Sequence, residues 1–124
     1  MHATVLLAVA GAGALGAVSR YVAVLAVRHW CGPDPLPIAV VNVLGCFGFG
    51  VCWALAHGRW SHPVATAVLA GFFGAFTTFS AFALDGHLLL VERRVLAFAL
   101  NVVGQNALGL GALWLGIVAA GGRG

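Results

Sequence analysis

Four long apolar runs, separated by three short polar breaks, constrain the fold of this chain more than any other feature. The runs cover roughly residues 3–27, 37–57, 64–90 and 95–119. A helix that crosses a bilayer needs about 20 mainly apolar residues, so each run is long enough to span a membrane. Hydrophobic residues make up 62% of the chain and charged residues 7%, which is too much apolar surface for a soluble core of 124 residues. We therefore expect an all-α, multi-pass protein of the cell membrane, with one domain of four transmembrane helices.

The breaks between the runs carry turn-forming and charged residues. They read RHWCGPDPLP (28–37), HGRWSHP (57–63) and VERR (91–94). Connections this short favour consecutive helices that pack side by side and antiparallel. The loop charges are Arg59 and Arg123 on one side, and Arg28, Arg93 and Arg94 with Asp34 and Glu92 on the other. Because loop arginines set orientation, two interpretations stay open: a weak bias orients the chain, or the chain inserts both ways and pairs with an inverted copy.

Several function classes lack the residues that they need. The six basic residues are arginines spread along the chain, so binding of nucleic acid by a basic patch is not expected. No Ser-His-Asp-type set is placed for catalysis, and we do not expect an enzyme. Cys31, Cys46 and Cys52 form no C-x-x-C pair, so we interpret them as small apolar side chains rather than metal or redox ligands.

Polar side chains inside the first two runs are costly unless protein surrounds them. Arg20 either reaches toward one interface or lies inside the first span, where a central arginine costs about 2.5–3.5 kcal/mol. Asn42 either joins helices by hydrogen bonds or presents its NH₂ group to a water-filled path. The first two spans contain no Glu or Lys to couple protons. Donors without acceptors favour a path for an anion over a path for a cation.

The later spans add more polar residues. Asn101 and Gln105 are four residues apart in the fourth span and share one helix face. They form either a contact between helices or a ladder of donors. Asp85 lies near the far end of the third span, where an arginine is its expected partner.

The stretch GAFTTFSAF (74–82) places two threonines and a serine among phenylalanines in the middle of the third span. One interpretation is a packed aromatic stripe whose hydroxyls bond to carbonyls of the preceding helical turn. The other is a local unwinding of the helix, which is tolerated at membrane depth only where protein or a cavity surrounds it. Carbonyls freed there can coordinate a small cation, and the edges of Phe79 and Phe82 can line the route of an anion. We expect a break in the third helix, because the stripe explains each residue singly but not all of them together.

Three motifs in this order resemble those of the Fluc/CrcB family of fluoride channels, over all four spans. The first-span motif is present as Ala12, Gly13, Gly16, Ala17, Arg20 and Tyr21. The second-span motif is present as Val41, Asn42, Gly45, Phe47 and Gly50. The third-span motif is present as Gly71, Phe72, Gly74, Thr77, Thr78, Phe79, Ser80 and Phe82. Asp85 stands where the family usually has Glu, Asn101 where Tyr is frequent and Gln105 where a hydroxyl residue is frequent.

The resemblance implies an antiparallel, dual-topology dimer with two pores that let fluoride leave the cell down its gradient. It implies a structural Na⁺ at the dimer centre, held by main-chain oxygens that belong by position to Gly74 and Thr77. The pore-lining residues would be Asn42, Thr78, Phe79, Ser80 and Phe82, with Asn101 and Gln105 as the fourth-span track. Arg20 and Asp85 would be structural polar residues. The partners would be fluoride, membrane lipids, and either an identical copy or a paralogous subunit.

Two other functions fit the length and the four spans. A small multidrug-resistance exporter needs a membrane-embedded Glu in its first span, where this chain has only Arg20 as an ionisable residue. A non-conducting subunit of a heterodimeric fluoride channel would move no ion when it is purified alone.

Overall fold

The computed structural model describes residues 2–32 and 35–122. Its elements are α1 (His2–Cys31), α2 (Leu36–Ala56), α3 (His62–Thr66), the π-helix η1 (Ala67–Phe73), α4 (Gly74–Phe76), α5 (Phe79–Val91) and α6 (Val95–Ala119). Four stretches are long and apolar enough to cross a membrane: Ala3–Cys31, Leu36–Ala56, His62–Val91 and Val95–Ala119. The expectation of an all-α fold with four candidate spans is therefore confirmed.

The observed helix limits differ from the expected ones mainly in the first span. Residues 28–31, which the sequence analysis assigned to the first connection, continue α1 as regular helix. The second helix begins at Leu36, close to the expected residue 37, and prolines mark its start, because α2 follows Pro35 directly and carries Pro37 in its first turn. Asp34 and Arg123, which entered the count of loop charges, lie outside the described residues.

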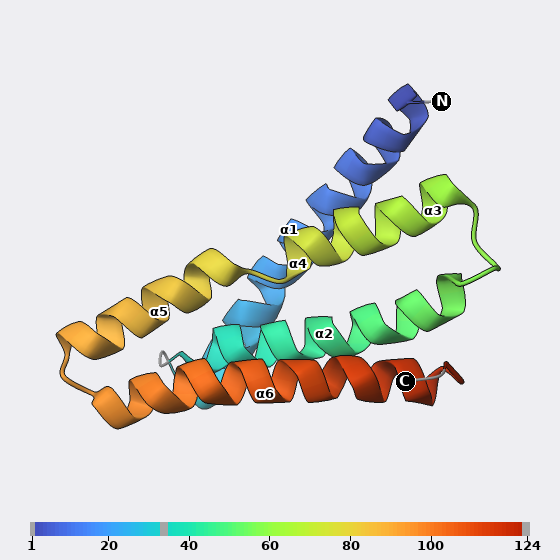
Figure 1. Ribbon diagram of the computed structural model, residues 1–124. Helices are drawn as coiled ribbons and strands as arrows, with labels where there is room; N and C mark the ends of the chain where they lie inside the picture. The colour runs from blue at the N-terminus through green and yellow to red at the C-terminus, as the bar shows by residue number, and fades with distance from the viewer. Residues whose placement is uncertain (1, 33–34, 123–124) are drawn as a thin grey trace.

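Helices α2 and α6 run side by side and in the same direction along most of their length (Figure 1). Glycines let their backbones approach closely. A Cβ atom at Gly50 would collide with the carbonyl oxygen of Leu113, and one at Gly116 would collide with that of Phe47. Small residues at such contacts are what membrane helices use to pack, since lipid supplies no hydrophobic drive toward association. The close packing of α2 and α6 places Asn42 and Gln105 beside each other.

The first half of the third span, from α3 through α4, packs on α1 (Figure 1). A Cβ atom at Gly16 would collide with the carbonyl oxygen of Phe72, so only glycine allows this approach. Phe72 lies in the π-helix η1, a feature that the sequence analysis did not anticipate. Single π-helical turns within α-helices often occur near functional sites, and this one lies just before the break.

The third span is interrupted at two residues, which confirms the expected break. Thr77 and Thr78 have extended backbone angles, with φ and ψ of −85° and 157° for Thr77 and of −147° and 120° for Thr78. The interruption is shorter than the sequence suggested, because Gly74 is helical in α4 and Ser80 belongs to α5. The Thr78 hydroxyl caps α5 by accepting the Ala81 N–H at 3.3 Å, which satisfies one donor of the new helix.

Few side chains are buried within this single chain. In the described ranges the buried hydrophobic residues are Val41, Phe73 and Leu89. Many leucines, valines and tryptophans point outward instead. Such a surface suits a molecule whose surroundings are lipid or another apolar helix.

Candidate functional site

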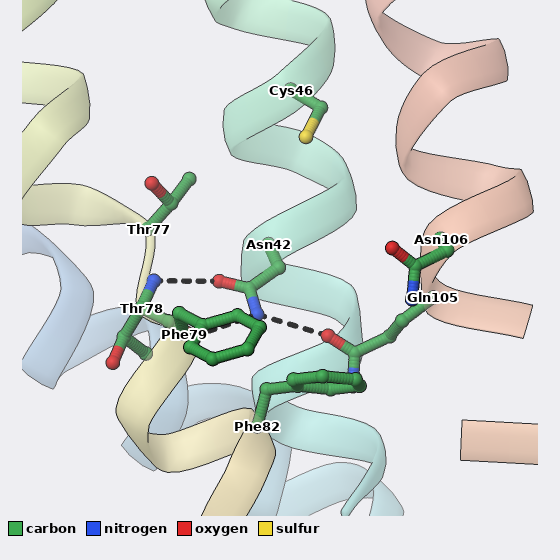
Figure 2. A pocket seen from close by; sticks show the side chains of 8 residues that line it. All are labelled: Asn42, Cys46, Thr77, Thr78, Phe79, Phe82, Gln105 and Asn106. Atoms are coloured by element: carbon green, nitrogen blue, oxygen red, sulfur yellow. Dashed lines mark hydrogen bonds between the residues drawn. The ribbon is translucent and has the colours of Figure 1, made fainter. Parts of the chain in front are cut away.

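A pocket of about 210 Å³ lies beside the break in the third span (Figure 2). Its walls come from α2, the break, α5 and α6. The lining residues are Asn42, Cys46, Thr77, Thr78, Phe79, Phe82, Gln105 and Asn106. The structure therefore gathers five residues that the sequence analysis assigned to a pore or its track: Asn42, Thr78, Phe79, Phe82 and Gln105.

The side-chain amide of Asn42 clamps the break. Its Oδ1 atom accepts the Thr78 N–H at 2.8 Å, and its Nδ2 atom donates to the Thr78 carbonyl at 3.1 Å. In a continuous helix the Thr78 N–H would return to the carbonyl of Gly74. Asn42 takes that donor instead, so a side chain of α2 replaces part of the backbone bonding that the third span gives up. The break is tolerated at this depth because its polar groups are bonded inside the protein.

A chain of amides continues from the clamp into α6. Asn42 Nδ2 also donates to Gln105 Oε1 at 2.9 Å, and Gln105 Nε2 donates to Asn101 Oδ1 at 2.7 Å. Asn101 is only 8% exposed, and its Nδ2 atom has no hydrogen-bond partner among the described residues. Asn101 and Gln105 thus combine the two roles suggested by their spacing, since they connect α6 to α2 and also form a ladder along one side.

Two phenylalanines of α5 also line the pocket. The ring centroids of Phe79 and Phe82 are 5.5 Å apart, with an angle of 47° between the ring planes. Phe79 is 79% exposed although it follows the break directly. An aromatic ring has a positive edge, and this edge is the part that attracts an anion. Figure 2 shows both rings near the Asn42 and Gln105 amides.

The three hydroxyl groups near the break have different partners. The Thr77 hydroxyl donates to the Phe73 carbonyl at 2.9 Å, as the interpretation of a packed stripe expected. The hydroxyls of Thr78 and Ser80 lie 3.2 Å apart and share one hydrogen bond. Ser80 is not among the residues that line the pocket; it lines a neighbouring groove with Arg20 and Tyr21, and Thr78 lines both.

Arg20 lies at the level of the break. Its Nη1 atom donates to the Thr77 carbonyl at 3.4 Å, so this half-buried cation bonds to the break in the middle of the third span. Among the described residues the charge of Arg28 acts on Asp85, although no arginine comes within 4.0 Å of its carboxyl group, and its buried Oδ2 atom has no hydrogen-bond partner there.

The two residues expected to hold sodium flank the short helix α4: Gly74 begins it, and Thr77 follows it as the first residue of the break. Gly74 is exposed, and a Cβ atom built on it would meet nothing within 4 Å. Within the described ranges, no three His, Cys, Asp or Glu side chains gather as a metal site. A cation at this place would depend on main-chain oxygens.

The sequence analysis missed two residues that line the pocket. Cys46 lies one helical turn after Asn42, so its spacing could have placed it on the same face. Asn106 follows Gln105 and bonds its own helix, donating to the Val102 carbonyl at 2.7 Å.

Comparison with known proteins matches the sequence of this chain to one family. The family described as CrcB-like protein, Camphor Resistance (CrcB), matches residues 7–117, which include both sides of the pocket and the break. The chain belongs to the CrcB-like family. The three motifs that suggested this family therefore identified it correctly.

Members of the CrcB-like family with curated names are similar to this chain over most of their length. The fluoride-specific ion channel FluC of Nitratidesulfovibrio vulgaris is 48% identical over 109 residues, covering 86% of this chain and 88% of that protein. The protein of the same name from Nitrosococcus oceani is 45% identical over 113 residues, covering 89% of each chain. The one from Desulforapulum autotrophicum is 44% identical over 113 residues. By these names the relatives are ion channels and not enzymes.

Proposed function

We propose that this chain is a fluoride-specific ion channel of the cell membrane, which lets fluoride leave the cell down its gradient. The observation that carries the proposal is the clamp of Asn42 on the break, beside a pocket that Phe79, Phe82 and Gln105 also line. The names of the related proteins support the same choice of ion. Residues 1–124 act in this proposal as a single four-helix domain.

The pocket offers what a desolvated anion needs. An ion that leaves water must exchange its hydration shell for hydrogen-bond donors, because an uncompensated charge in an apolar medium is very costly. The Asn42 amide N–H groups, once released from a present acceptor, and the Thr78 hydroxyl supply donors in this pocket. The ring edges of Phe79 and Phe82 supply weaker positive charge. Carboxylates, which would repel an anion, are absent from the lining.

The chain works in this proposal as an antiparallel, dual-topology dimer, formed with an inverted identical copy or with a paralogous subunit. The near balance of loop arginines supports insertion in both orientations. The outward-facing apolar side chains and the open space beside Gly74 leave room for a second chain. Two copies would give two equivalent pockets, and hence two pores.

A sodium ion fits the main-chain carbonyl oxygens that the break provides as ligands. The Thr78 N–H that would have bonded the Gly74 carbonyl goes to Asn42, so that carbonyl is released from its helical role. Carbonyl oxygens of Gly74 and Thr77 from two copies would number four, without the carboxylates that calcium prefers. When bound, the ion would neutralise carbonyl dipoles between the subunits. The Thr77 carbonyl also accepts from Arg20, so it would be shared between two cations.

Reconstitution of the purified chain alone into liposomes tests the function. Vesicles loaded with potassium fluoride should release fluoride after a potassium ionophore is added, and vesicles loaded with potassium chloride should retain chloride. Exchange of organic cations for protons would point to a multidrug exporter instead. No flux of any ion from well-folded protein would point to a non-conducting subunit that needs a paralogous partner.

A further inference from the structure

Both protons of the Asn42 side-chain amide are already engaged within the chain. One is donated to the Thr78 carbonyl at 3.1 Å and the other to Gln105 Oε1 at 2.9 Å. A side-chain amide has two N–H donors. Asn42 therefore has no donor left for an ion in the pocket that it lines. An anion that binds Asn42 must first displace one of these two carbonyl oxygens.

The carbonyl of Gln105 is the one that can leave. The Thr78 carbonyl belongs to the backbone, and the Thr78 N–H is bonded to Asn42 Oδ1 at 2.8 Å, so releasing it means opening the whole clamp. Gln105 has a long side chain with several rotatable bonds, and one hydrogen bond joins it to Asn42. Its departure leaves the break intact.

The backbone fixes which end of each amide faces its neighbour. The Thr78 N–H can only donate, so Asn42 must present Oδ1 to it and Nδ2 to Gln105. Gln105 must then present Oε1 to Asn42, which turns its Nε2 atom toward Asn101 Oδ1. This series of hydrogen bonds ends at the buried Nδ2 atom of Asn101, which has no partner among the described residues.

We propose that Gln105 is a specificity-determining cap on Asn42, which an anion must displace in order to bind. This inference rests on the proposed function, and it explains how that function discriminates between halides. Hydrogen bonds to a charged acceptor are shorter and roughly twice as strong as those to a neutral carbonyl. The attraction grows as the distance falls. Fluoride is smaller than chloride and approaches the N–H more closely, so it competes with the Gln105 carbonyl where chloride does not.

Asn101 is a positioning residue in this arrangement. By accepting from Gln105 Nε2 at 2.7 Å, it holds the Gln105 carbonyl toward Asn42. Since Asn101 is almost fully buried, its own position is fixed by the surrounding helices. When an anion takes the Asn42 donor, the bond between Gln105 and Asn101 is disturbed as well.

The variant Gln105→Met tests the cap by fluoride and chloride efflux from liposomes. Methionine keeps the length and volume of the side chain but cannot hold the Asn42 N–H as an amide carbonyl does. The ratio of fluoride to chloride efflux should fall up to about tenfold, the equivalent of one neutral hydrogen bond, while fluoride still passes. Asn101→Leu should lower the ratio by less. The matched control is Leu108→Met on α6, because the Leu108 side chain is 63% exposed and takes no part in the chain of amide hydrogen bonds.

Two outcomes of this experiment overturn the cap. One is a folded Gln105→Met protein with the wild-type ratio of fluoride to chloride efflux. The other is loss of fluoride efflux at an unchanged ratio, which would make Gln105 a donor to the ion or a contact between helices.

Nuclear magnetic resonance of labelled side-chain amides tests the cap without relying on flux. Sodium fluoride should shift the wild-type signals of Gln105 and Asn101 together, and sodium chloride at the same concentration should not. In Gln105→Met the Asn101 signal should no longer respond to fluoride. A fluoride-dependent shift of the Asn42 signal without a shift of the Gln105 signal overturns the inference, even if the chain conducts fluoride. If the signals shift as expected but no fluoride efflux is measured, the proposed function is wrong and the cap remains.

Discussion

The two halves of the third span differ sharply in how they are held. The half before the break packs on α1 through direct backbone contact, as Gly16 and Phe72 show. The half after the break diverges from α1 and meets α6 over a much smaller area, leaving Phe79 79% exposed (Figure 1). The comparison separates two tasks: the tightly packed half is a scaffold, and the loosely packed half presents the groups that would meet an ion.

The largest expected effect comes from disturbing the scaffold half. Gly16→Ala places a Cβ atom against the Phe72 carbonyl, and overpacking of this kind costs about 1–3 kcal/mol or more. Gly11→Ala on the same helix is the control, because a Cβ atom there meets nothing within 4 Å. Thermal unfolding in detergent should show a clear loss of stability for Gly16→Ala only. Equal stability of the two variants would mean that the close approach of α1 and η1 is wrong.

A large loss of flux with little loss of stability is expected on the other half. Phe79→Ile and Phe82→Ile remove ring edges but keep apolar volume, so packing should change by less than about 1.5 kcal/mol. Fluoride efflux from liposomes should fall by about tenfold or more, which corresponds to about 1.4 kcal/mol of lost stabilisation of the ion. Size-exclusion chromatography should show unchanged assembly. Near-normal efflux would return both rings to a packing role.

Removal of sodium should lower the stability of the protein, because the proposed ion binds at the break between the two halves of the third span. Protein purified without Na⁺ should unfold at lower temperature, and a site filled at 100 times its dissociation constant contributes about 2.7 kcal/mol. Added Na⁺ should restore stability better than K⁺, and Thr77→Ser should behave as wild type because the proposed ligands are main-chain oxygens. Equal stability with and without sodium would remove the ion from the account and leave the pocket in place.

The smallest effect concerns orientation rather than either half. His57→Lys together with Ser61→Lys adds two positive charges beside Arg59, which should make insertion one-sided. Fluoride efflux of this variant expressed alone should then fall. Co-expression with Glu92→Lys, which biases insertion the other way, should restore it. Uniform one-sided labelling of the unmodified chain would contradict dual topology.

The sequence predicted the fold well because lipid exposure leaves a strong pattern. Apolar runs and the short polar breaks between them specify four helices, and adjacent threonines able to cap a new helix specify the interruption. The π-helix at residues 67–73 was not predictable, since the apolar stretch AVLAGFF has no side chain that marks an extra residue per turn. The extension of α1 through residues 28–31 was missed for a similar reason, because arginine and tryptophan are compatible with both a helix end and a loop.

The candidate site was predictable in its members but not in its bonds. Polar residues at membrane depth pointed to Asn42, Thr78 and Gln105, and the structure brings these together. Which atom faces which could not be predicted, because it follows from the Thr78 N–H, whose release from the helix is a tertiary effect. Asp85 shows the same limit, since which arginine acts on it depends on helix placement, and the structure gives Arg28.

The central claim is that fluoride crosses beside the Asn42 amide, and fluoride efflux by Asn42 variants tests it most directly. Asn42→Asp keeps an oxygen for the Thr78 N–H but removes both donors, and Asn42→Leu removes the clamp without adding charge. Both variants, checked for correct folding by size-exclusion chromatography, should lose about 10- to 100-fold of the wild-type efflux, the equivalent of one hydrogen bond to an ion. Wild-type fluoride efflux from folded Asn42→Leu protein would contradict the claim.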